Sequence, residues 1–421
     1  MQCTLPGAPT EDHVSESRFV IVGGGMVAGY AAKQFVELGL KPEELAILSA
    51  DTSLPYERPP LSKGFLAGKD SEDAIRINHE DFYRKHGIEV KCGCEVSGVD
   101  PERKRLTLKS GGQFRFDKLL VATGASPRTL EIPGAKLRNL HYLRSLDNSK
   151  AIRNSADTVR RAVVIGGGFI GMEVAAVLAQ KGVEVTMVLS DDRIWKRLFS
   201  PEMSSFFEAY YAARGVRFVK AAKVTELRGD GVVGAVVLGG GEAISCEMVI
   251  AGIGVRPVTD LLANSGIDVA DGVIVNEYLE TSNPDILAAG DVANYQDLVF
   301  EKRRRLEHWD NAVSQGQYCA RALMGERTPF RLVPYFFSDV FDLSYEYWGD
   351  SSDADHVVHR GDVSSKSFSV WWLRQKRVVA AFAMNRPEDE RDAAPKWIET
   401  RQSVSGALLK DASRPISAAL E

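Results

Sequence analysis

FVIVGGGMVAGYAAKQF (19–35) and AVVIGGGFIGMEVAAVLAQ (162–180) follow one plan along this chain. Each begins with a short run of apolar, mostly β-branched residues, continues through three glycines and ends in a helical pattern. An apolar strand follows each helix, ELAILS at 44–49 and VEVTMVL at 183–189. A strand, a glycine-rich turn, a helix and a second parallel strand make up a dinucleotide-binding βαβ unit. The internal repeat therefore predicts two such domains.

Three more apolar segments, at 116–128, 247–257 and 285–295, each end in a turn of small residues. Their order predicts an α/β fold in which the second Rossmann-like domain is inserted in the first. From about residue 326, stretches such as SFSVWWL and RVVAAFAM predict a smaller α+β domain. The predicted division is a flexible tail at 1–17, a first dinucleotide domain at 18–145 and 258–325, a second at 146–257, and the C-terminal domain at 326–421.

Composition excludes several classes of function. The net charge of -5 argues against a nucleic-acid partner, which requires a basic face. No apolar run approaches the roughly 18 to 20 residues that span a bilayer. The N-terminal residues lack the basic and then apolar order of a signal peptide, so we expect a cytoplasmic protein. No two of the five cysteines form a C-x-x-C pair, which argues against catalysis through a protein disulfide.

The first glycine loop fits the G-x-G-x-x-G/A fingerprint, with predicted cofactor contacts at Gly23, Gly25, Met26, Val27 and Ala28. The first glycine permits a tight turn, and the second lets the backbone approach a pyrophosphate. The helix start that follows attracts phosphate groups. A sharp turn without a ligand is the alternative. Asp51, after the second strand, is predicted to bind a ribose hydroxyl, or it is a solvated turn residue.

Five motifs follow one another in a specific order: PYERPPLSK (55–63), ATGASPR (122–128), GGGFIGME (166–173), AAGDVA (288–293) and RLEHWDNA (305–312). Together they resemble the FAD-dependent pyridine nucleotide oxidoreductases, which include ferredoxin reductases, apoptosis-inducing factor and monodehydroascorbate reductases. The resemblance covers nearly the whole chain after the tail. It is nearest to the monodehydroascorbate reductases, by stretches such as ELAILS and PYERPPLSKGFL.

The resemblance implies that the first domain binds FAD. Arg58 would bring positive charge to the pyrophosphate, and Lys63 would bring it to the flavin ring. Either could instead be an exposed charge beside a proline-rich turn. Further FAD or passage-lining residues implied by the resemblance are Val96, Thr123, Gly124, Arg128, Arg144, Gly290 and Asp291. Asp291 would bind a ribityl hydroxyl, although a carboxylate after a strand and a glycine also suits a helix cap.

The second loop is assigned to NADH or NADPH, with predicted contacts at Gly166, Gly168, Phe169, Ile170, Gly171 and Gly254. Asp191 follows the next strand and would accept from the adenosine ribose. It would repel the extra phosphate of NADPH, as would Asp192, whereas Arg193, Lys196 and Arg197 would attract it. We expect NADH to be preferred. Arg197 matches a cofactor-contacting arginine of the family, or it is a surface arginine.

Glu173 lies in the first turn of an otherwise apolar helix, where an unpaired carboxylate is costly to bury. The family pairs this glutamate with the lysine of its PPLSK motif, which here is Lys63. Such a pair would fix the lysine and stabilise negative charge on the flavin. A favourable acid near a helix N-terminus is the alternative.

A helix is predicted to start near Trp309, and its N-terminus would favour an anionic flavin. Glu307, His308 and Trp309 match residues that contact the flavin or the nicotinamide in relatives, and Trp309 could alternatively be a core residue. The preceding basic run, Lys302–Arg305, is a solvated face or a dock for an acidic electron carrier.

The electron acceptor stays open at this stage. Plant monodehydroascorbate reductases have arginine at the position of Val313 and tyrosine at the position of Phe337, and both are associated with binding of the ascorbate radical. Ferredoxin reductases usually have tryptophan at the Phe337 position, which is also counted as a cofactor contact. We predict an NAD(P)H oxidoreductase that passes electrons to a ferredoxin-like carrier, monodehydroascorbate or a quinone. The alternative is a slow, NADH-responsive redox sensor resembling apoptosis-inducing factor. No metal site is predicted.

Overall fold

The computed structural model describes residues 15–196 and 198–421, and it divides into two compact units. Unit 1 contains the described residues up to Arg58, Glu72–Ser126 and Arg256–Leu332. Unit 2 contains Pro59–Ser71, Pro127–Val255 and Val333–Glu421. The chain thus leaves unit 1 before residue 127 and returns to it at residue 256, which agrees with the predicted insertion. The 59–71 segment, close to the first loop in sequence, belongs to unit 2.

The main sheet of unit 1 has the strand order β3-β2-β1-β6-β5-β4, and β19 also pairs with β6. Its strands are β1 (Ser15–Val22), β2 (Leu45–Leu48), β3 (Glu89–Lys91), β4 (Val96–Asp100), β5 (Arg105–Leu108), β6 (Gln113–Val121) and β19 (Ile286–Ala288). The parallel central strands are buried throughout residues 19–22, 45–48, 119–121 and 286–288, which explains the apolar sequences of these stretches. Val22 aligns with Val121, and Val121 with Ala288, so three strands end at one edge.

Two helices cover this part of unit 1, α1 (Met26–Glu37) and α6 (Trp309–Leu323), and they pack closely on each other. Their approach depends on Gly316 of α6, where an added Cβ would lie 2.7 Å from the carbonyl oxygen of Val27. Unit 1 also contains a smaller sheet and short helices: β17 (Val269–Ala270), β18 (Gly272–Ile274), β20 (Ala293–Asp297), β21 (Lys302–Arg304), α2 (Glu80–Lys85), η2 (Asp260–Leu262) and η3 (Gly290–Val292).

The second Rossmann-like sheet lies in unit 2, in the order β11-β10-β9-β15-β8. Its strands are β8 (Leu140–His141), β9 (Arg161–Ile165), β10 (Glu184–Val188), β11 (Val216–Val219) and β15 (Met248–Ala251), and all pair in parallel. The associated helices are α3 (Leu146–Ala156), α4 (Phe169–Gln180), α5 (Pro201–Ala212) and η1 (Pro59–Ser62). A three-stranded sheet and a two-stranded pair complete it: β12 (Val224–Arg228), β13 (Ala235–Leu238) and β14 (Ala243–Ser245), then β7 (Ala125–Pro127) and β16 (Val255–Pro257).

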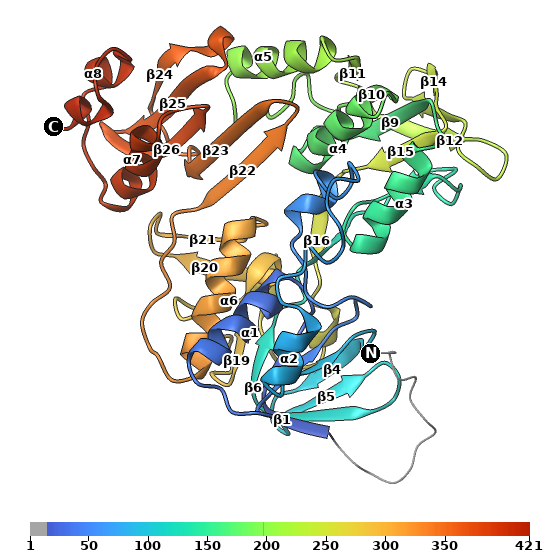
Figure 1. Cartoon of the computed structure of the whole chain (residues 1–421), viewed down its shortest axis with the longest axis vertical. Coiled ribbons are helices and arrows are strands. Elements are labelled where there is room, and N and C mark those ends of the chain that lie inside the picture. Colours follow the sequence, from blue (N-terminus) through green and yellow to red (C-terminus); the bar gives the residue numbers. More distant parts are fainter. Residues whose placement is uncertain (1–14, 197) are drawn as a thin grey trace. The chain divides into compact units, whose positions relative to one another are not determined.

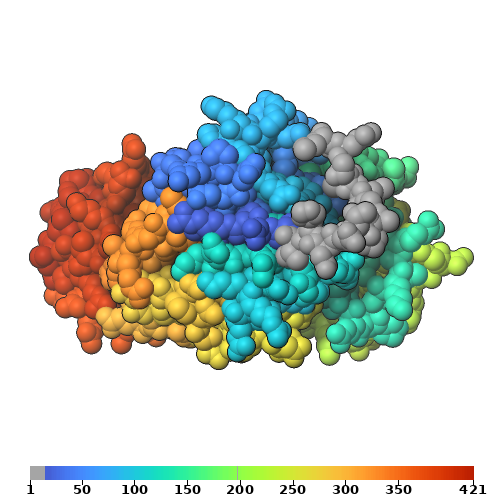
Figure 2. All heavy atoms as spheres, turned by 90° about the horizontal axis from the view of Figure 1, so that it is seen from below, coloured from blue at the N-terminus to red at the C-terminus, as the bar shows by residue number. Residues whose placement is uncertain are grey.

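The C-terminal part of unit 2 is an antiparallel sheet with helices, as predicted. The sheet order is β22-β23-β26-β25-β24, built from β22 (Tyr335–Val340), β23 (Leu343–Gly349), β24 (His356–Asp362), β25 (Ser367–Arg374) and β26 (Arg377–Met384). Its helices are α7 (Glu388–Glu399), α8 (Gly406–Lys410), η4 (Val363–Ser365) and η5 (Ile416–Ala419). The atoms of this C-terminal region form one continuous body in the space-filling view (Figure 2).

Aromatic side chains join the C-terminal sheet to the second Rossmann-like fold inside unit 2. The Trp195 ring packs edge-on against Phe207 of α5 and Tyr345 of β23, with centroids 4.9 and 6.1 Å away. Phe169, at the start of α4, lies 4.5 Å from Phe336 of β22. These contacts belong to one hydrophobic core, so β22 is held beside α4.

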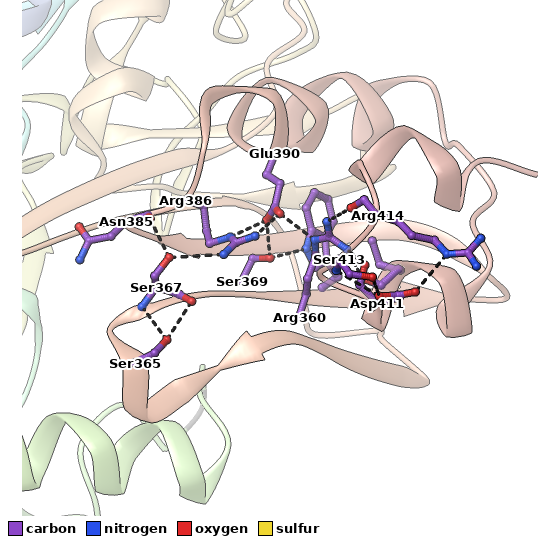
Figure 3. Close-up of polar contacts among 12 residues, drawn as sticks. Arg360, Ser365, Ser367, Ser369, Asn385, Arg386, Glu390, Asp411, Ser413 and Arg414 are labelled. Carbon is purple, nitrogen blue, oxygen red and sulfur yellow. Dashed lines mark hydrogen bonds and ion pairs between the residues drawn. The ribbon is translucent and has the colours of Figure 1, made fainter.

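A buried arginine, Arg360 of β24, anchors the end of the chain (Figure 3). Its Nε donates to Glu390 of α7 at 2.7 Å, and its Nη atoms donate to the carbonyl oxygens of Leu409, Asp411 and Arg414 at 3.1, 2.6 and 2.6 Å. Because its donors end on the buried Glu390 and on three carbonyl oxygens of the C-terminal segment, we assign the arginine a structural role.

Candidate functional site

The first glycine loop leaves β1 through a conformation that requires glycine. Gly23 has a φ of +123°, and an added Cβ would lie 2.1 Å from the carbonyl oxygen of Ala122. At Gly25, by contrast, the nearest atom to an added Cβ is Nη2 of Arg58 at 3.9 Å. The helix that begins at Met26 has neither a capping side chain nor an acid in its first turn. Its amides and the adjacent guanidinium therefore fit a pyrophosphate.

Asp51 is linked to Arg58 by a phenol that the sequence analysis did not select. Tyr56, which is 2% exposed, donates to Oδ2 of Asp51 at 2.8 Å, and Nη1 of Arg58 donates to the Tyr56 oxygen at 2.7 Å. The Arg58 guanidinium also lies over the Tyr56 ring at 4.5 Å. The position of Tyr56 along the chain, between Asp51 and Arg58, was the available signal. In this arrangement Asp51 can bind a ribose hydroxyl, and the neighbouring Arg58 can bind a phosphate.

The edge where β1, β6 and β19 end carries further predicted positions. The Thr123 hydroxyl donates to the carbonyl oxygen of Val258 at 2.6 Å, and the Val258 amide donates to Gly124 at 3.0 Å. The Gly290 amide donates to the buried side chain of Gln315 at 2.7 Å. These contacts fix the turns around the strand ends without using the side chain that follows Gly290.

The residue that follows Gly290 is Asp291, which is half-buried inside η3. The remaining unit 1 position, Val96, is the half-buried first residue of β4 and pairs with Leu108. The structure therefore places Asp291 near the edge at which β1, β6 and β19 end. It places Val96 in β4, an antiparallel strand that stands last in the order of the same sheet.

The predicted helix starts at Trp309, and a carboxylate fixes its first side chain. Nε1 of Trp309 donates to Oε2 of Glu57 at 2.7 Å, and the Tyr30 hydroxyl donates to Oε1 of the same glutamate at 2.5 Å. His308 is the N-cap residue, and burial lowers its pKa to about 4, so its imidazole is neutral near pH 7. Glu307 is exposed. The sequence analysis missed Glu57 and Tyr30.

The second loop repeats the geometry of the first. Gly166 has a φ of +104°, and an added Cβ would lie 2.2 Å from the carbonyl oxygen of Gly252. Gly168 has no atom within 4 Å of such a Cβ, and α4 starts at Phe169 without a capping side chain. The nearby Ile170 is 47% exposed. The loop therefore also fits a dinucleotide pyrophosphate.

Helix α4 packs closely on this loop at Gly171, where only a residue without a Cβ fits. A Cβ on Gly171 would lie 2.5 Å from the carbonyl oxygen of Gly166. On the loop after β15, the Gly254 carbonyl accepts from the Arg128 amide at 2.9 Å. The exposed Arg128 side chain donates to the carbonyl oxygen of Val255 at 3.2 Å. These contacts bring a predicted passage residue, Arg128, together with a predicted dinucleotide contact, Gly254, in unit 2.

The acids and bases after β10 are not equally available. Asp192 forms an ion pair with Lys196 at 3.0 Å. Arg193 donates to the Phe199 and Lys196 carbonyl oxygens and to Ser204. Asp191 is exposed and has no ion pair with another described residue. Arg197 lies outside the described residues.

Lys63 and Glu173, far apart in sequence, meet in unit 2. Nζ of Lys63 lies 2.6 Å from Oε1 of Glu173, whose side chain is 5% exposed. Glu173 also accepts from the hydroxyls of Ser62 and Ser338, neither of which the sequence analysis selected. One prediction about this residue was wrong: α4 has no acid in its first turn, so Glu173 lies beyond it. The alternative of a helix N-terminal acid is therefore weakened, and the pair with Lys63 accounts for its burial.

Phe337 and Arg144 are two more predicted residues of unit 2. Phe337 lies near the Lys63–Glu173 pair, and Arg144 lies just before α3. The Phe337 ring of β22 is half-buried, with its centroid 5.8 Å from Nζ of Lys63. Arg144 precedes α3, and its amide donates to Asn148 at 3.1 Å. The structure thus brings Phe337 to Lys63, and it gives Arg144 a half-buried position.

The arginines of the basic run before α6 are engaged by neighbouring groups of unit 1. Arg303 donates to the carbonyl oxygens of Val275 and Asn294, at 2.9 and 2.6 Å. Nε of Arg304 lies 3.1 Å from Oδ2 of the buried Asp297. Arg305 pairs with Asp271 and Glu307, at 3.1 and 2.7 Å. These three guanidinium groups stabilise the β20–β21 hairpin and its surroundings.

Other kinds of site find no support in the described part of the chain. Cys92, Cys94, Cys246 and Cys319 form no disulfide there, and Cys3 lies outside it. No group of three potential metal ligands occurs among residues 15–196 and 198–421. In the same residues, no helix combines the length and the apolar character needed to cross a bilayer.

Comparisons with known proteins agree with this geometry. Residues 17–316 match the family described as pyridine nucleotide-disulphide oxidoreductase, and residues 335–420 match the reductase C-terminal family. The ferredoxin reductase subunit of a 5,5'-dehydrodivanillate O-demethylase from Sphingobium is 37% identical over 400 residues, covering 94% of this chain and 97% of the relative. Peroxisomal monodehydroascorbate reductase 4 of Arabidopsis thaliana is 35% identical over 407 residues, covering 92% and 83%.

A solved structure shows the same arrangement of elements. Putidaredoxin reductase, in a covalent complex with putidaredoxin, superposes with a TM-score of 0.91 at 31% identity, covering 96% of this chain and 99% of that one. Members of this family bind FAD and use NAD(P)H as the electron donor. With two open glycine loops and a C-terminal reductase fold, the chain belongs to the pyridine nucleotide-disulphide oxidoreductase family, as an FAD-dependent enzyme that takes electrons from a nicotinamide dinucleotide.

Proposed function

We propose that the chain is an NADH-dependent reductase of a small ferredoxin-like electron carrier. The carrying observation is the apolar character of two positions where an ascorbate-radical enzyme uses an arginine and a tyrosine. Val313 is 8% exposed inside α6, and Phe337 offers a hydrocarbon ring on β22. Neither can attract or hydrogen-bond an anionic radical. The 37% identical ferredoxin reductase subunit and the likeness to putidaredoxin reductase support a protein acceptor.

We assign FAD to residues 18–145 and 258–325, the nicotinamide dinucleotide to 146–257, and an accessory role to 326–421. The proposed FAD ligands are those placed above in unit 1, with Arg58 and the α1 amides on the pyrophosphate and Asp51 on the ribose. The proposed dinucleotide ligands are the α4 loop and Asp191.

The preference for NADH rests on how the charges after β10 are used. Asp191 keeps its negative charge without a described cationic partner, so it suits a ribose hydroxyl and repels a phosphate. Arg193 and Lys196, the cations expected to attract that phosphate, are engaged with neighbouring groups. A chain organised in this way favours NADH over NADPH.

When bound, FAD supplies the chemistry that links a two-electron donor to a one-electron acceptor. The chain's residues hold and polarise it. Glu173 holds the Lys63 ammonium in place through their ion pair, so that its positive charge could stabilise negative charge on a bound flavin. Glu57 orients the Trp309 indole at the start of α6, whose N-terminal amides add positive potential. The neutral imidazole of His308 can donate through one ring nitrogen and accept through the other without adding charge.

The second candidate, a slow redox sensor, shares the cofactors and differs in kinetics. A sensor would hold a long-lived complex of reduced flavin and NAD, whereas a reductase turns over rapidly. We also propose a cytoplasmic location.

Anaerobic stopped-flow mixing of the purified holoprotein tests these proposals. Reduction by NADH and by NADPH is followed at the flavin band, and the reduced protein is then mixed with a ferredoxin, a quinone or the ascorbate radical. We expect faster reduction by NADH and fastest reoxidation by the ferredoxin. Fastest reoxidation by the ascorbate radical would refute the carrier proposal. A persistent long-wavelength band and slow reoxidation by every acceptor would favour the sensor.

A further inference from the structure

The Glu173 carboxylate accepts three hydrogen bonds from two other segments of unit 2. Oε1 accepts from Nζ of Lys63 at 2.6 Å and from Oγ of Ser338 at 2.5 Å, and Oε2 accepts from Oγ of Ser62. Lys63 and Ser62 come from the η1 segment, whereas Ser338 comes from β22 of the C-terminal sheet. The lysine and one serine therefore share a single carboxylate oxygen.

Both serines are almost completely buried, at 1% exposure each. A buried hydroxyl without a partner is costly, so these side chains persist because they donate to the carboxylate. Hydrogen bonds to an ionised group are stronger than those between neutral groups. The Ser338 bond consequently fixes the position of Oε1 and disperses part of its charge, which leaves more of the Lys63 charge uncompensated.

The surroundings identify Glu173 and Lys63 as the charged groups of this cluster among the described residues. The phenols of Tyr211 and Tyr345 lie within electrostatic range of Glu173, from α5 and β23. Burial raises the pKa of both phenols well above the ordinary value, so they stay neutral at working pH. Asp339 is exposed on the other face of β22.

We propose that Ser338 is a positioning residue for the donor half of the reaction. Its hydroxyl, delivered by the C-terminal sheet, holds the Glu173 carboxylate so that Lys63 keeps its place and its charge. Ser62 does the same at the second oxygen. This inference rests on the proposed role of the Lys63–Glu173 pair. It gives the C-terminal sheet a direct part in the reaction with NADH.

The test compares Ser338→Ala and Ser338→Thr in the FAD-loaded protein. We expect the alanine variant to lower the limiting rate of flavin reduction by NADH roughly tenfold, since one hydrogen bond to a charged group is lost. The flavin midpoint potential should become more negative because less positive charge stabilises the anionic ring. The NADH concentration for half-maximal rate should stay unchanged. Threonine, which keeps the hydroxyl, should restore both the rate and the potential.

Ser369→Ala is the matched control, because Ser369 donates to Glu390, a second buried glutamate of unit 2, at 2.8 Å. It should leave rate and potential unchanged. Wild-type rate and potential in Ser338→Ala would overturn the proposal, as would equal losses in the alanine and threonine variants. If Ser338→Ala does not fold, Ser62→Ala replaces it with the same expectations. Failure of the wild type to reduce a carrier would refute the proposed function alone, since this test uses only NADH.

Discussion

Two buried glutamates in unit 2 differ in what their cationic partners can still do. Glu390, 2% exposed, accepts from Arg360, Arg386 and Ser369, and Glu173, 4% exposed, accepts from Lys63 and two serines. Although burial alone would raise the pKa of Glu390, the hydrogen bonds from Arg386, Arg360 and Ser369 lower it. Both carboxylates are therefore fully satisfied, and burial alone does not separate a structural site from a reactive one.

The cations provide the difference. The Arg360 side chain is 3% exposed, and its donors end on Glu390 and on three carbonyl oxygens of the C-terminal segment (Figure 3). The Lys63 side chain is 17% exposed, and its ammonium group makes one hydrogen bond within the described chain, to Glu173. A guanidinium that makes four hydrogen bonds to groups of its own chain fixes a fold, whereas an ammonium with unused donors can serve a ligand. This distinction leads to the following predictions.

The largest expected effect is on folding, at Arg360. Arg360→Met should destabilise the protein by about 3–5 kcal/mol, because it leaves the Glu390 carboxylate short of a donor and releases three carbonyl oxygens. The free energy of unfolding from denaturant titration measures this, with near-ultraviolet circular dichroism reporting on the C-terminal tryptophans.

Arg374→Met is the control for that variant, since the Arg374 side chain is 58% exposed and pairs loosely with Asp353 at 3.7 Å. It should change the free energy of unfolding by less than about 1 kcal/mol. The double variant Arg360→Met with Glu390→Met should recover part of the loss. A double variant as unstable as the sum of the two single variants would contradict the pairing argument.

The next effect is kinetic, at Lys63. Lys63→Met should slow flavin reduction by NADH roughly 10²–10³-fold while FAD remains bound, because the variant removes charge stabilisation and no pyrophosphate ligand. Stopped-flow absorbance gives the rate, and the flavin-to-protein absorbance ratio gives FAD content. Lys118→Met is the control, since Lys118 also pairs with a carboxylate at 2.6 Å, on Asp285. Normal reduction in both Lys63→Met and Glu173→Gln would refute the role of the pair.

Asp310 is a third carboxyl group to compare with Glu390 and Glu173. It has no cationic partner among the described residues. Burial raises its pKa to about 6. The folded state thus holds this proton more tightly than the unfolded state, so its contribution is favourable below about pH 4 and is lost as the pH rises to about 6. Asp310→Asn should therefore stabilise the protein by about 1 kcal/mol near pH 7.5 and change little near pH 4.

Denaturant titrations at both pH values test this prediction. The exposed Asp339→Asn provides the comparison, and its effect should be small at each pH. An equal stabilisation by Asp310→Asn at the two pH values would show that charge is not the cause.

The sequence was sufficient for the two Rossmann-like folds, their nesting and the C-terminal α+β region. The glycine loops have strict local rules, and the predicted helix start at Trp309 is confirmed because the preceding loop and the helical pattern are both local. The basic run at Lys302–Arg305 was harder to interpret, since a run of charges does not reveal that its partners are carbonyls and acids brought by other strands.

The residues that the sequence analysis missed share one property: their partners lie far away along the chain. Ser338 donates to a carboxylate 165 positions earlier, and the Trp309 indole finds Glu57 252 positions earlier. A serine in an apolar strand has no sequence signal for such a bond. Only Tyr56, five positions from Asp51, had a partner close enough to be suspected from the motif.

The smallest effect is expected for a change at Tyr56, which contacts the Asp51 carboxylate. The cationic partner of Asp51, Arg58, is farther from its carboxylate than Arg360 and Lys63 are from theirs. The ion pair between Asp51 and Arg58 is 3.8 Å long, and the Tyr56 hydroxyl bridges the two groups. Tyr56→Phe keeps the ring and removes the bridge, so we expect the FAD dissociation constant to rise about threefold, equivalent to one hydrogen bond at the weak end of its range, about 0.7 kcal/mol. Tyr83→Phe is the matched control, because Tyr83 is 3% exposed and its hydroxyl accepts from Asn78 instead. Equilibrium release of FAD, followed by flavin fluorescence, should separate the two variants. Equal affinities would show that Asp51 and Arg58 hold their positions without the phenol, as Arg360 and Glu390 do through direct contact.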